Sequence, residues 1–161
     1  MPLWLERWTE GSLELLRRCN TDEMTTFLGG PESEEKLISR HVRYLGYLQD
    51  DPVVAWPLRV IVDDVAVGSV TYWRTGVGFE IGWAIAPEHQ GKGYATTAVL
   101  AALGHATGNG NAGRFHACPS VENAASNGVA RSVGFTLLRQ LDIEYPPGHT
   151  MRANEWVLDL V

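Results

Sequence analysis

The sequence predicts a single α/β domain with a sheet of six or seven strands and about four helices. Three observations predict it. A chain of 161 residues is long enough to bury a full core without disulfides or structural metal. Residues 77–86 alternate large apolar and small side chains, which is typical of a strand. Residues 95–106 place apolar side chains on one helical stripe directly after a glycine-rich turn.

Composition excludes several classes of protein. Thirteen Lys and Arg against nineteen Asp and Glu give a net charge of −6, which disfavours a nucleic-acid partner. Two cysteines are too few for a disulfide framework or a cysteine zinc site. Charged residues interrupt the first ten positions, and no apolar run approaches the roughly 18 residues of a membrane span. We therefore expect one cytoplasmic domain over residues 1–161, without a metal and without a membrane segment.

Local patterns predict the elements of the first half. Ser12 is a candidate N-cap, and acidic residues followed by Arg40 and Arg43 match the dipole of a helix. Asp63-Asp64 between two β-branched runs suits a tight hairpin. The predicted elements are a strand at 3–9, a helix at 12–18, a helix at about 32–49 and a hairpin within 53–73.

The strand at 77–86 is the most informative one. Its odd positions are large and apolar, so that one face builds the core. Its even positions are small, with the single exception of Glu80, which leaves room for a ligand against that face. These even positions are Gly78, Glu80, Gly82, Ala84 and Ala86.

The second half continues as an alternation of helices and strands. The helix after the glycine-rich turn ends in the Gly- and Asn-rich segment 108–113. A strand at 114–118, a loop at 119–122 and a helix at 123–133 closed by Gly134 follow. Two last strands, at 135–143 and 154–160, are joined through the Pro146-Pro147-Gly148 turn.

The turn at 90–95 has the features of a phosphate-binding loop, because its glycines let backbone N–H groups approach an anion at a helix N-terminus. A P-loop needs Ser or Thr after its Gly-Lys pair, and here Gly93 follows Lys92. A dinucleotide fingerprint needs Gly or Ala where Thr96 stands. Neither of these two nucleotide-binding patterns is met.

The stretch from Trp83 to Ala95 resembles the acyl-CoA signature of the GCN5-related N-acetyltransferase (GNAT) superfamily. That signature, Gln/Arg-x-x-Gly-x-Gly/Ala, is filled by Gln90, Gly93 and Ala95. A second block, Asn123-Ala124-Ala125-Ser126-Asn127 followed by Gly134-Phe135, resembles a segment of the ribosomal-protein N-terminal acetyltransferases of the RimJ/RimL type. The two blocks occur in the family's order, and the N-terminal third matches only in pattern.

The resemblance implies a mixed, mostly antiparallel sheet that is splayed between its fourth and fifth strands, 79–86 and 114–118. The pantetheine arm of acetyl-CoA would run in this gap, against main-chain groups of Trp83 and Ile85, and its pyrophosphate would lie on the turn. Gly78, Gly82 and Ala84 would form the acceptor-side floor. Lys92 would either meet the 3′-phosphate or remain a solvated loop lysine. The implied cofactor-binding residues are Trp83, Ala84, Ile85, Gln90, Gly91, Lys92, Gly93, Tyr94, Ala95 and Asn123.

Two catalytic roles follow from the same resemblance. Glu80 is the candidate general base, since a protonated amine cannot attack a thioester; the alternative is an exposed or salt-bridged glutamate. Ser126 is the candidate proton donor to the CoA thiolate, because Ala130, Arg131 and Ser132 occupy the region where many members carry Tyr. The alternatives are that Asn123 is an N-cap and that Ser126 bonds the helix backbone. Tyr145 is a second candidate for the acid.

Other residues carry weaker signals. His116 and Cys118 share one face of the strand beside the expected thioester, where a base or an acyl-cysteine is conceivable, although a small core cysteine is the commoner case. Arg40, His41 and Tyr44 are candidate acceptor contacts, and surface charge explains Arg40 equally well.

The predicted function is direct transfer of acetyl from acetyl-CoA to a primary amine on a small molecule or a peptide N-terminus, and a homodimer is compatible with this. One alternative is a noncatalytic acyl-CoA-binding module, and another is an NAD(P)-dependent oxidoreductase. Fold analogy does not choose the acceptor.

Overall fold

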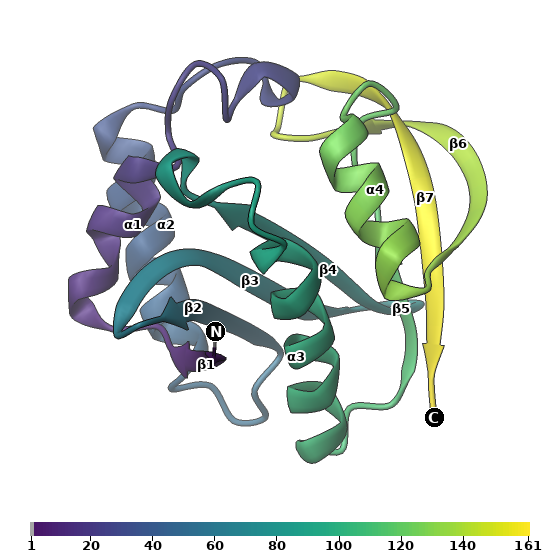
Figure 1. The fold of residues 1–161 in the computed structure, drawn as a ribbon, viewed down its shortest axis with the longest axis horizontal. Helices are drawn as coiled ribbons and strands as arrows, with labels where there is room; N and C mark the ends of the chain where they lie inside the picture. The colour runs from purple at the N-terminus through teal and green to yellow at the C-terminus, as the bar shows by residue number, and fades with distance from the viewer. Residues whose placement is uncertain (1) are drawn as a thin grey trace.

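Seven strands form one sheet in the order β1-β2-β3-β4-β5-β7-β6 in the computed structural model, which describes residues 2–161 (Figure 1). Neighbouring strands are antiparallel except β4 and β5, which are parallel. This confirms the predicted mixed sheet. The strands are β1 (Leu3–Arg7), β2 (Ala55–Val62), β3 (Val65–Thr75), β4 (Gly78–Ile85), β5 (Gly113–Ala117), β6 (Thr136–Glu144) and β7 (Thr150–Leu160).

Each predicted helix is present, with ends that differ by at most two residues. Figure 1 shows α3 and α4 in front of the sheet, and α1 beside α2 at the end formed by β1 to β3. Three short 3-10 helices, η1 (Glu10–Ser12), η2 (Thr26–Leu28) and η3 (Pro87–His89), complete the chain. The α-helices are α1 (Leu13–Arg18), α2 (Glu34–Tyr47), α3 (Tyr94–Gly108) and α4 (Ala124–Val133). Among residues 2–161, no helix is long and apolar enough to cross a bilayer.

Local chemistry accounts for several of these boundaries. Ser33 caps α2 by accepting a hydrogen bond from the Lys36 N–H at 3.2 Å, and two glutamates lie in its first turn. Asp63 and Asp64 have φ values of 51° and 62°, the geometry of a type I′ turn, and this confirms the predicted hairpin.

The last strand is longer than the sequence predicts. β7 begins at Thr150, where the prediction began at 154, because the Tyr145 N–H donates to the His149 carbonyl at 2.8 Å and closes a tight turn. The antiparallel ladder therefore extends out to the pair of Glu144 and Thr150.

The main core lies between the sheet and the two helices α3 and α4. Phe79 on β4 and Phe115 on β5 are fully buried and stack with ring centroids 4.7 Å apart. Ala98, Ala102 and Ala106 bring α3 close to the sheet, since none of them is exposed. Trp83 is half-buried against this core, as its place in the alternation of β4 predicts.

β4 and β5 are joined over only two residue pairs, Phe79 with Phe115 and Glu80 with His116. β4 continues to Ile85 without further pairing to β5, so the two strands separate beyond Glu80. This confirms the predicted splay between the fourth and fifth strands. The separation leaves a gap lined by the main chain of β4.

Gly78 has a different role from the one the sequence suggests. The sequence places it in the acceptor-side floor with Gly82. Its φ is +133°, and a Cβ there would collide with the carbonyl oxygen of Arg114 on β5. Gly78 therefore permits the close approach of the paired ends of the two strands. At Gly82, by contrast, a Cβ would meet nothing within 4 Å, so this part of the floor is open.

Candidate functional site

The turn between β4 and α3 contains two glycines that the backbone requires. Gly91 and Gly93 have φ values of +78° and +79°, a region that L side chains rarely adopt. Neither position has a heavy atom within 4 Å of where a Cβ would stand. Gly93 is the N-cap of α3, and no side chain caps this helix end. The first N–H groups of α3, at Tyr94 and Ala95, are thus available to an anion.

Gln90 holds this turn against the end of β4. Its Nε2 donates to the Ile85 carbonyl at 2.9 Å and also lies 2.9 Å from Sδ of Met24. The neighbouring Glu88 forms an ion pair with Arg18 of α1 at 3.2 Å. The side chain of Gln90 is therefore a structural part of the turn.

The main chain of β4 presents polar groups to the gap. The Ala86 N–H donates to the Val67 carbonyl of β3 at 2.8 Å. Because successive residues of a strand direct their N–H and C=O groups to opposite sides, those of Ala84 also face β3, and those of Trp83 and Ile85 face the β5 side. Pairing to β5 has ended at Glu80, so the Trp83 groups and the Ile85 N–H lie on an open strand edge.

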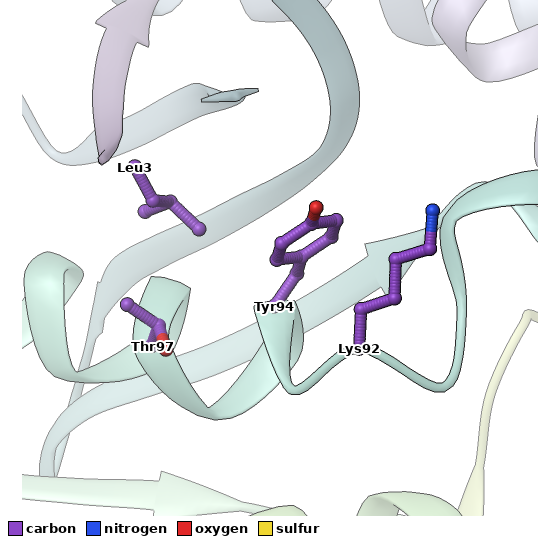
Figure 2. A pocket seen from close by; sticks show the side chains of 4 residues that line it. All are labelled: Leu3, Lys92, Tyr94 and Thr97. Atoms are coloured by element: carbon purple, nitrogen blue, oxygen red, sulfur yellow. The ribbon is translucent and has the colours of Figure 1, made fainter. Parts of the chain in front are cut away.

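Two pockets lie near these elements. The larger, of about 350 Å³, is lined by Leu3 of β1, Lys92, Tyr94 and Thr97, and Figure 2 shows these four side chains around it. It contains no residue of β4 or β5. The smaller, of about 170 Å³, is lined by Thr75, Val77, Phe79, Glu80, His116 and Glu155, and it is the one that includes the ionisable groups beside the splay.

Glu80 lies where β4 and β5 part. It is half-buried and forms no ion pair with any residue in the range 2–161, so neither an exposed nor a salt-bridged glutamate describes it. Burial raises the pKa of its carboxyl group, His116 works against this shift and the nearby Glu155 adds to it.

His116 is held by residues that the sequence analysis did not single out. Its Nδ1 lies 3.0 Å from Oε2 of Glu155 on β7, and Arg139 of β6 donates to Oε1 of the same carboxylate at 2.7 Å. Burial works to raise the pKa of Glu155, but the hydrogen bonds from Arg139 and His116 outweigh it, and the pKa is lowered. The signal available in the sequence was a lone charged residue, Glu155, in the stretch 153–158.

Asn123 is the N-cap of α4, since its side chain accepts from the Ser126 N–H at 3.1 Å. The hydroxyl of Ser126 is half-buried and makes no hydrogen bond to the helix backbone within residues 2–161. The hydroxyls of Thr97 and Thr107, by contrast, bond carbonyls one turn back. Of the two structural alternatives, the capping role of Asn123 is thus observed, and a backbone bond from Ser126 is not.

Asn127 attaches α4 to the sheet. Its Nδ2 donates to the carbonyls of Ser120 and Asn123, and its Oδ1 accepts from Asn154 and from the Trp156 indole at 2.9 and 2.8 Å. The side chain is buried. A polar residue on the apolar stripe of a short helix was the signal for this role, which was not predicted.

We expect Asn127→Ala to lower the free energy of unfolding by about 3 kcal/mol, because two buried donors lose their acceptor. Urea unfolding measures this. Asn109→Ala is the control, since that exposed side chain bonds its own helix, and it should change stability by less than about 1 kcal/mol. Equal effects of the two substitutions would contradict the anchoring role.

Cys118 follows β5 on the face of Glu80 and His116. Burial, together with the negative charges of Glu80 and Glu155, raises the pKa of its thiol to about 12. The thiolate is therefore scarce at neutral pH, and a cysteine nucleophile is disfavoured.

In a Cys19→Ser variant, iodoacetamide should label Cys118 roughly a thousandfold more slowly in the native protein at pH 7 than in urea. Intact mass after incubation with acetyl-CoA should show no acetylated enzyme. Rapid native labelling or a stable acetyl adduct would contradict this prediction.

The candidate acceptor contacts are mostly engaged in the fold. His41 is buried and its Nδ1 accepts from the Trp8 indole at 2.9 Å. Arg40 forms an ion pair with Glu32, and Tyr44 packs edge-on against Trp8. Tyr145 lies among Tyr44, Arg40, Glu32 and Glu80, whose charges act on it, while burial raises the pKa of its phenol.

Comparison with known proteins identifies the family. The family model of the acetyltransferase (GNAT) domain matches residues 3–136. This chain belongs to the GNAT acetyltransferase family. The glycine-rich turn is therefore that of a GNAT domain, and the predicted fold and acyltransferase class are confirmed. No curated protein matches the chain.

Solved structures of several acetyltransferases share the fold. An acetyl transferase of Salmonella typhimurium that modifies the N-terminal serine of ribosomal protein L7/L12 has 22% identity and a TM-score of 0.81, covering 99% of this chain and 95% of its own. Spermidine N-acetyltransferase from Vibrio cholerae, solved with CoA and spermine, has 20% identity and a TM-score of 0.79, covering 98% and 95%. Aminoglycoside acetyltransferase AAC(6')-Ib, solved with coenzyme A, has 16% identity and a TM-score of 0.79, covering 98% and 95%.

Proposed function

We propose that this GNAT protein transfers the acetyl group of acetyl-CoA directly to a primary amine, with Glu80 as the general base. The observation that carries the proposal is the position of Glu80. It is a half-buried carboxylate without an ion-pair partner among residues 2–161, and it lies at the point where β4 and β5 separate. The open position at Gly82 leaves space beside it on the same face of β4.

The chemistry suits such a group. A primary amine is mostly protonated at neutral pH and must lose a proton before its nitrogen can attack the thioester carbonyl. Burial raises the pKa of Glu80, which makes its carboxylate a stronger base than that of an exposed glutamate. The amine then attacks, the C–S bond breaks, and a proton from the nitrogen ends on the thiolate.

The donor substrate fits the groups that the chain presents. The uncapped start of α3 and the open glycines 91 and 93 suit a pyrophosphate. The free main-chain groups of Trp83 and the Ile85 N–H suit the amides of a pantetheine arm. Backbone dipoles hold such an anion without a basic surface, so the net charge of −6 is compatible with this substrate.

We propose Ser126 as the donor of a hydrogen bond or proton to the leaving thiolate. Ser126→Ala should lower kcat about tenfold with an unchanged KM for acetyl-CoA, since a thiolate is already a fair leaving group. Release of free thiol measures this. Ser132→Ala on the exposed side of the same helix is the control, and full turnover of Ser126→Ala would exclude this role.

The acceptor class is tested by thiol release from acetyl-CoA with a panel of primary amines: a peptide with N-terminal serine, spermidine and kanamycin. The proteins of similar fold act on amines of these kinds. A parallel thermal-shift series with acetyl-CoA, CoA and NAD(P) measures ligand binding, which adds about 2.7 kcal/mol of stability at 100 times Kd. Stabilisation by CoA without thiol release from any amine would support the noncatalytic alternative.

A further inference from the structure

The hydrogen bonds around His116 determine which of its ring nitrogens carries the proton. Glu155 is ionised at neutral pH and can only accept, so the Nδ1 that lies 3.0 Å from it is the protonated nitrogen. The Nε2 of the neutral ring then carries a free electron pair. Arg139 holds the other carboxylate oxygen and keeps Glu155 in place.

The Nε2 of His116 is buried and has no hydrogen-bond partner among residues 2–161. A buried ring nitrogen without a partner lowers stability, and an exception of this kind calls for an explanation. The side chains of His116 and Glu155 are only 12% and 10% exposed, so bulk water does not supply the missing hydrogen-bond partner.

Glu80 is the direct cross-strand neighbour of His116 in the last pair of the β4–β5 ladder. Paired strands lie about 5 Å apart, so the two side chains leave the sheet together on one face. Both line the 170 Å³ pocket with the hydroxyl-bearing Thr75, and this volume is large enough for several water molecules.

Every strand that packs against His116 contributes a charged or titratable group to its surroundings. These groups are Glu80 on β4, Arg114 and Cys118 on and after β5, Arg139 on β6, and Glu155 and Asp159 on β7. Glu80 also acts on Tyr145 in the β6–β7 turn.

We propose that His116, oriented by Glu155 and Arg139, relays to solvent the proton that Glu80 takes from the acceptor ammonium. The inference rests on the proposed role of Glu80 as general base. In the first step R–NH3⁺ and the Glu80 carboxylate become R–NH2 and the carboxylic acid. In the second step this acid passes its proton through water in the pocket to Nε2, which restores the carboxylate and forms an imidazolium beside ionised Glu155. Water in the pocket then takes the proton, and His116 returns to its neutral form.

The kinetic test uses spermidine and a peptide with N-terminal serine as acceptors. His116→Gln and Glu155→Gln should each lower kcat about tenfold at neutral pH, leave KM for acetyl-CoA unchanged and alter the pH–rate profile. The double variant should be no slower than His116→Gln, because Glu155 acts through His116. Imidazole added to His116→Ala should restore part of the rate. His105→Gln, in the last turn of α3 where the ring contacts the Tyr72 hydroxyl, is the matched control.

A spectroscopic test needs no acceptor. In the full-length protein labelled with ¹⁵N-histidine, the His116 ring should show the Nδ1–H tautomer. Glu155→Gln should mix the two tautomers, and Glu80→Gln should shift the Nε2 resonance. An Nε2–H tautomer in the wild type, or no response to Glu80→Gln, overturns the relay.

The outcomes separate the two proposals. If Glu80→Gln loses turnover while His116→Gln keeps the wild-type kcat and pH profile, the proposed relay through His116 is wrong and Glu80 is supported as the general base. If Glu80→Gln keeps full turnover, the proposed base is wrong. If the wild type acetylates neither probe, the tautomer measurement decides on the relay. Thermal midpoints of all variants identify any that fail to fold.

Discussion

Glu80→Gln should lower kcat/KM for amine acetylation by roughly 10²- to 10³-fold, the usual contribution of a general base. The amide keeps the size of the side chain and removes its basicity. In the wild type, kcat/KM should rise with pH as the carboxylate ionises, and this rise should lie at higher pH than for an ordinary glutamate, because burial raises the pKa of Glu80. The variant should lack this rise. Thiol release measured across pH tests both expectations.

Protein stability provides an independent readout for the same variant. Because the folded-state pKa of Glu80 is raised, the folded protein binds its proton more tightly than the unfolded chain does. The contribution of this group to stability is therefore lost as pH rises through the raised pKa. Glu80→Gln should consequently unfold at the same or a higher temperature than the wild type at pH 7 to 8.

The matched control for this pair of measurements is Glu10→Gln, an exposed glutamate in η1. It should change neither the rate nor the midpoint. A large loss of activity in Glu80→Gln together with a lower thermal midpoint would point to misfolding, and unchanged activity and an unchanged pH profile would remove Glu80 from the mechanism.

Gly93→Ala should weaken acetyl-CoA binding about tenfold or more. At φ +79° an L residue is strained by about 1 to 2 kcal/mol, and the new methyl group would point into the open space at the start of α3. Either effect displaces the backbone N–H groups that we propose to bind the pyrophosphate of CoA. Calorimetric titration with CoA measures the change in Kd.

Gly104→Ala controls for the insertion of a methyl group into the same helix. Gly104 lies within α3, it has no positive φ, and a Cβ there would also meet nothing within 4 Å. This substitution should raise stability by up to about 1 kcal/mol and leave CoA affinity unchanged. Wild-type CoA affinity in Gly93→Ala would show that the turn does not bind the pyrophosphate.

Much of the fold could be predicted because its signals are local. The alternation in 77–86 identifies β4 and its two faces, except at its ends, where Val77 is exposed and Ala86 is buried outside the strand. Asp63-Asp64 identifies a turn whose φ values the structure confirms. Gly91 and Gly93 could be assigned to a tight turn before the helix because few other residues adopt their φ. The second motif placed Asn123 at the start of a helix, where it is indeed the cap.

Where local patterns end, prediction was incomplete or wrong. In the sequence, Gly78 is indistinguishable from Gly82. The structure shows that glycine is required at position 78 because a Cβ there would collide with the carbonyl of Arg114 on another strand. His41 reads as a contact on a helix face, yet it is buried under Trp8. The start of the last strand was missed because the hydrogen bond from the Tyr145 N–H to the His149 carbonyl extends the ladder to Thr150.

By itself, then, the sequence determined where the strands, the helices and the glycine turn lie, and that Glu80 is the one carboxylate on the small-residue face of its strand. It could do so because periodicity and backbone φ are properties of neighbouring residues. Only the tertiary structure decided that β7 lies beside β5, which brings Glu155 against His116 from 39 positions away and Asn127 against Trp156 from 29. These partners meet through strand order and register, which no local spacing encodes.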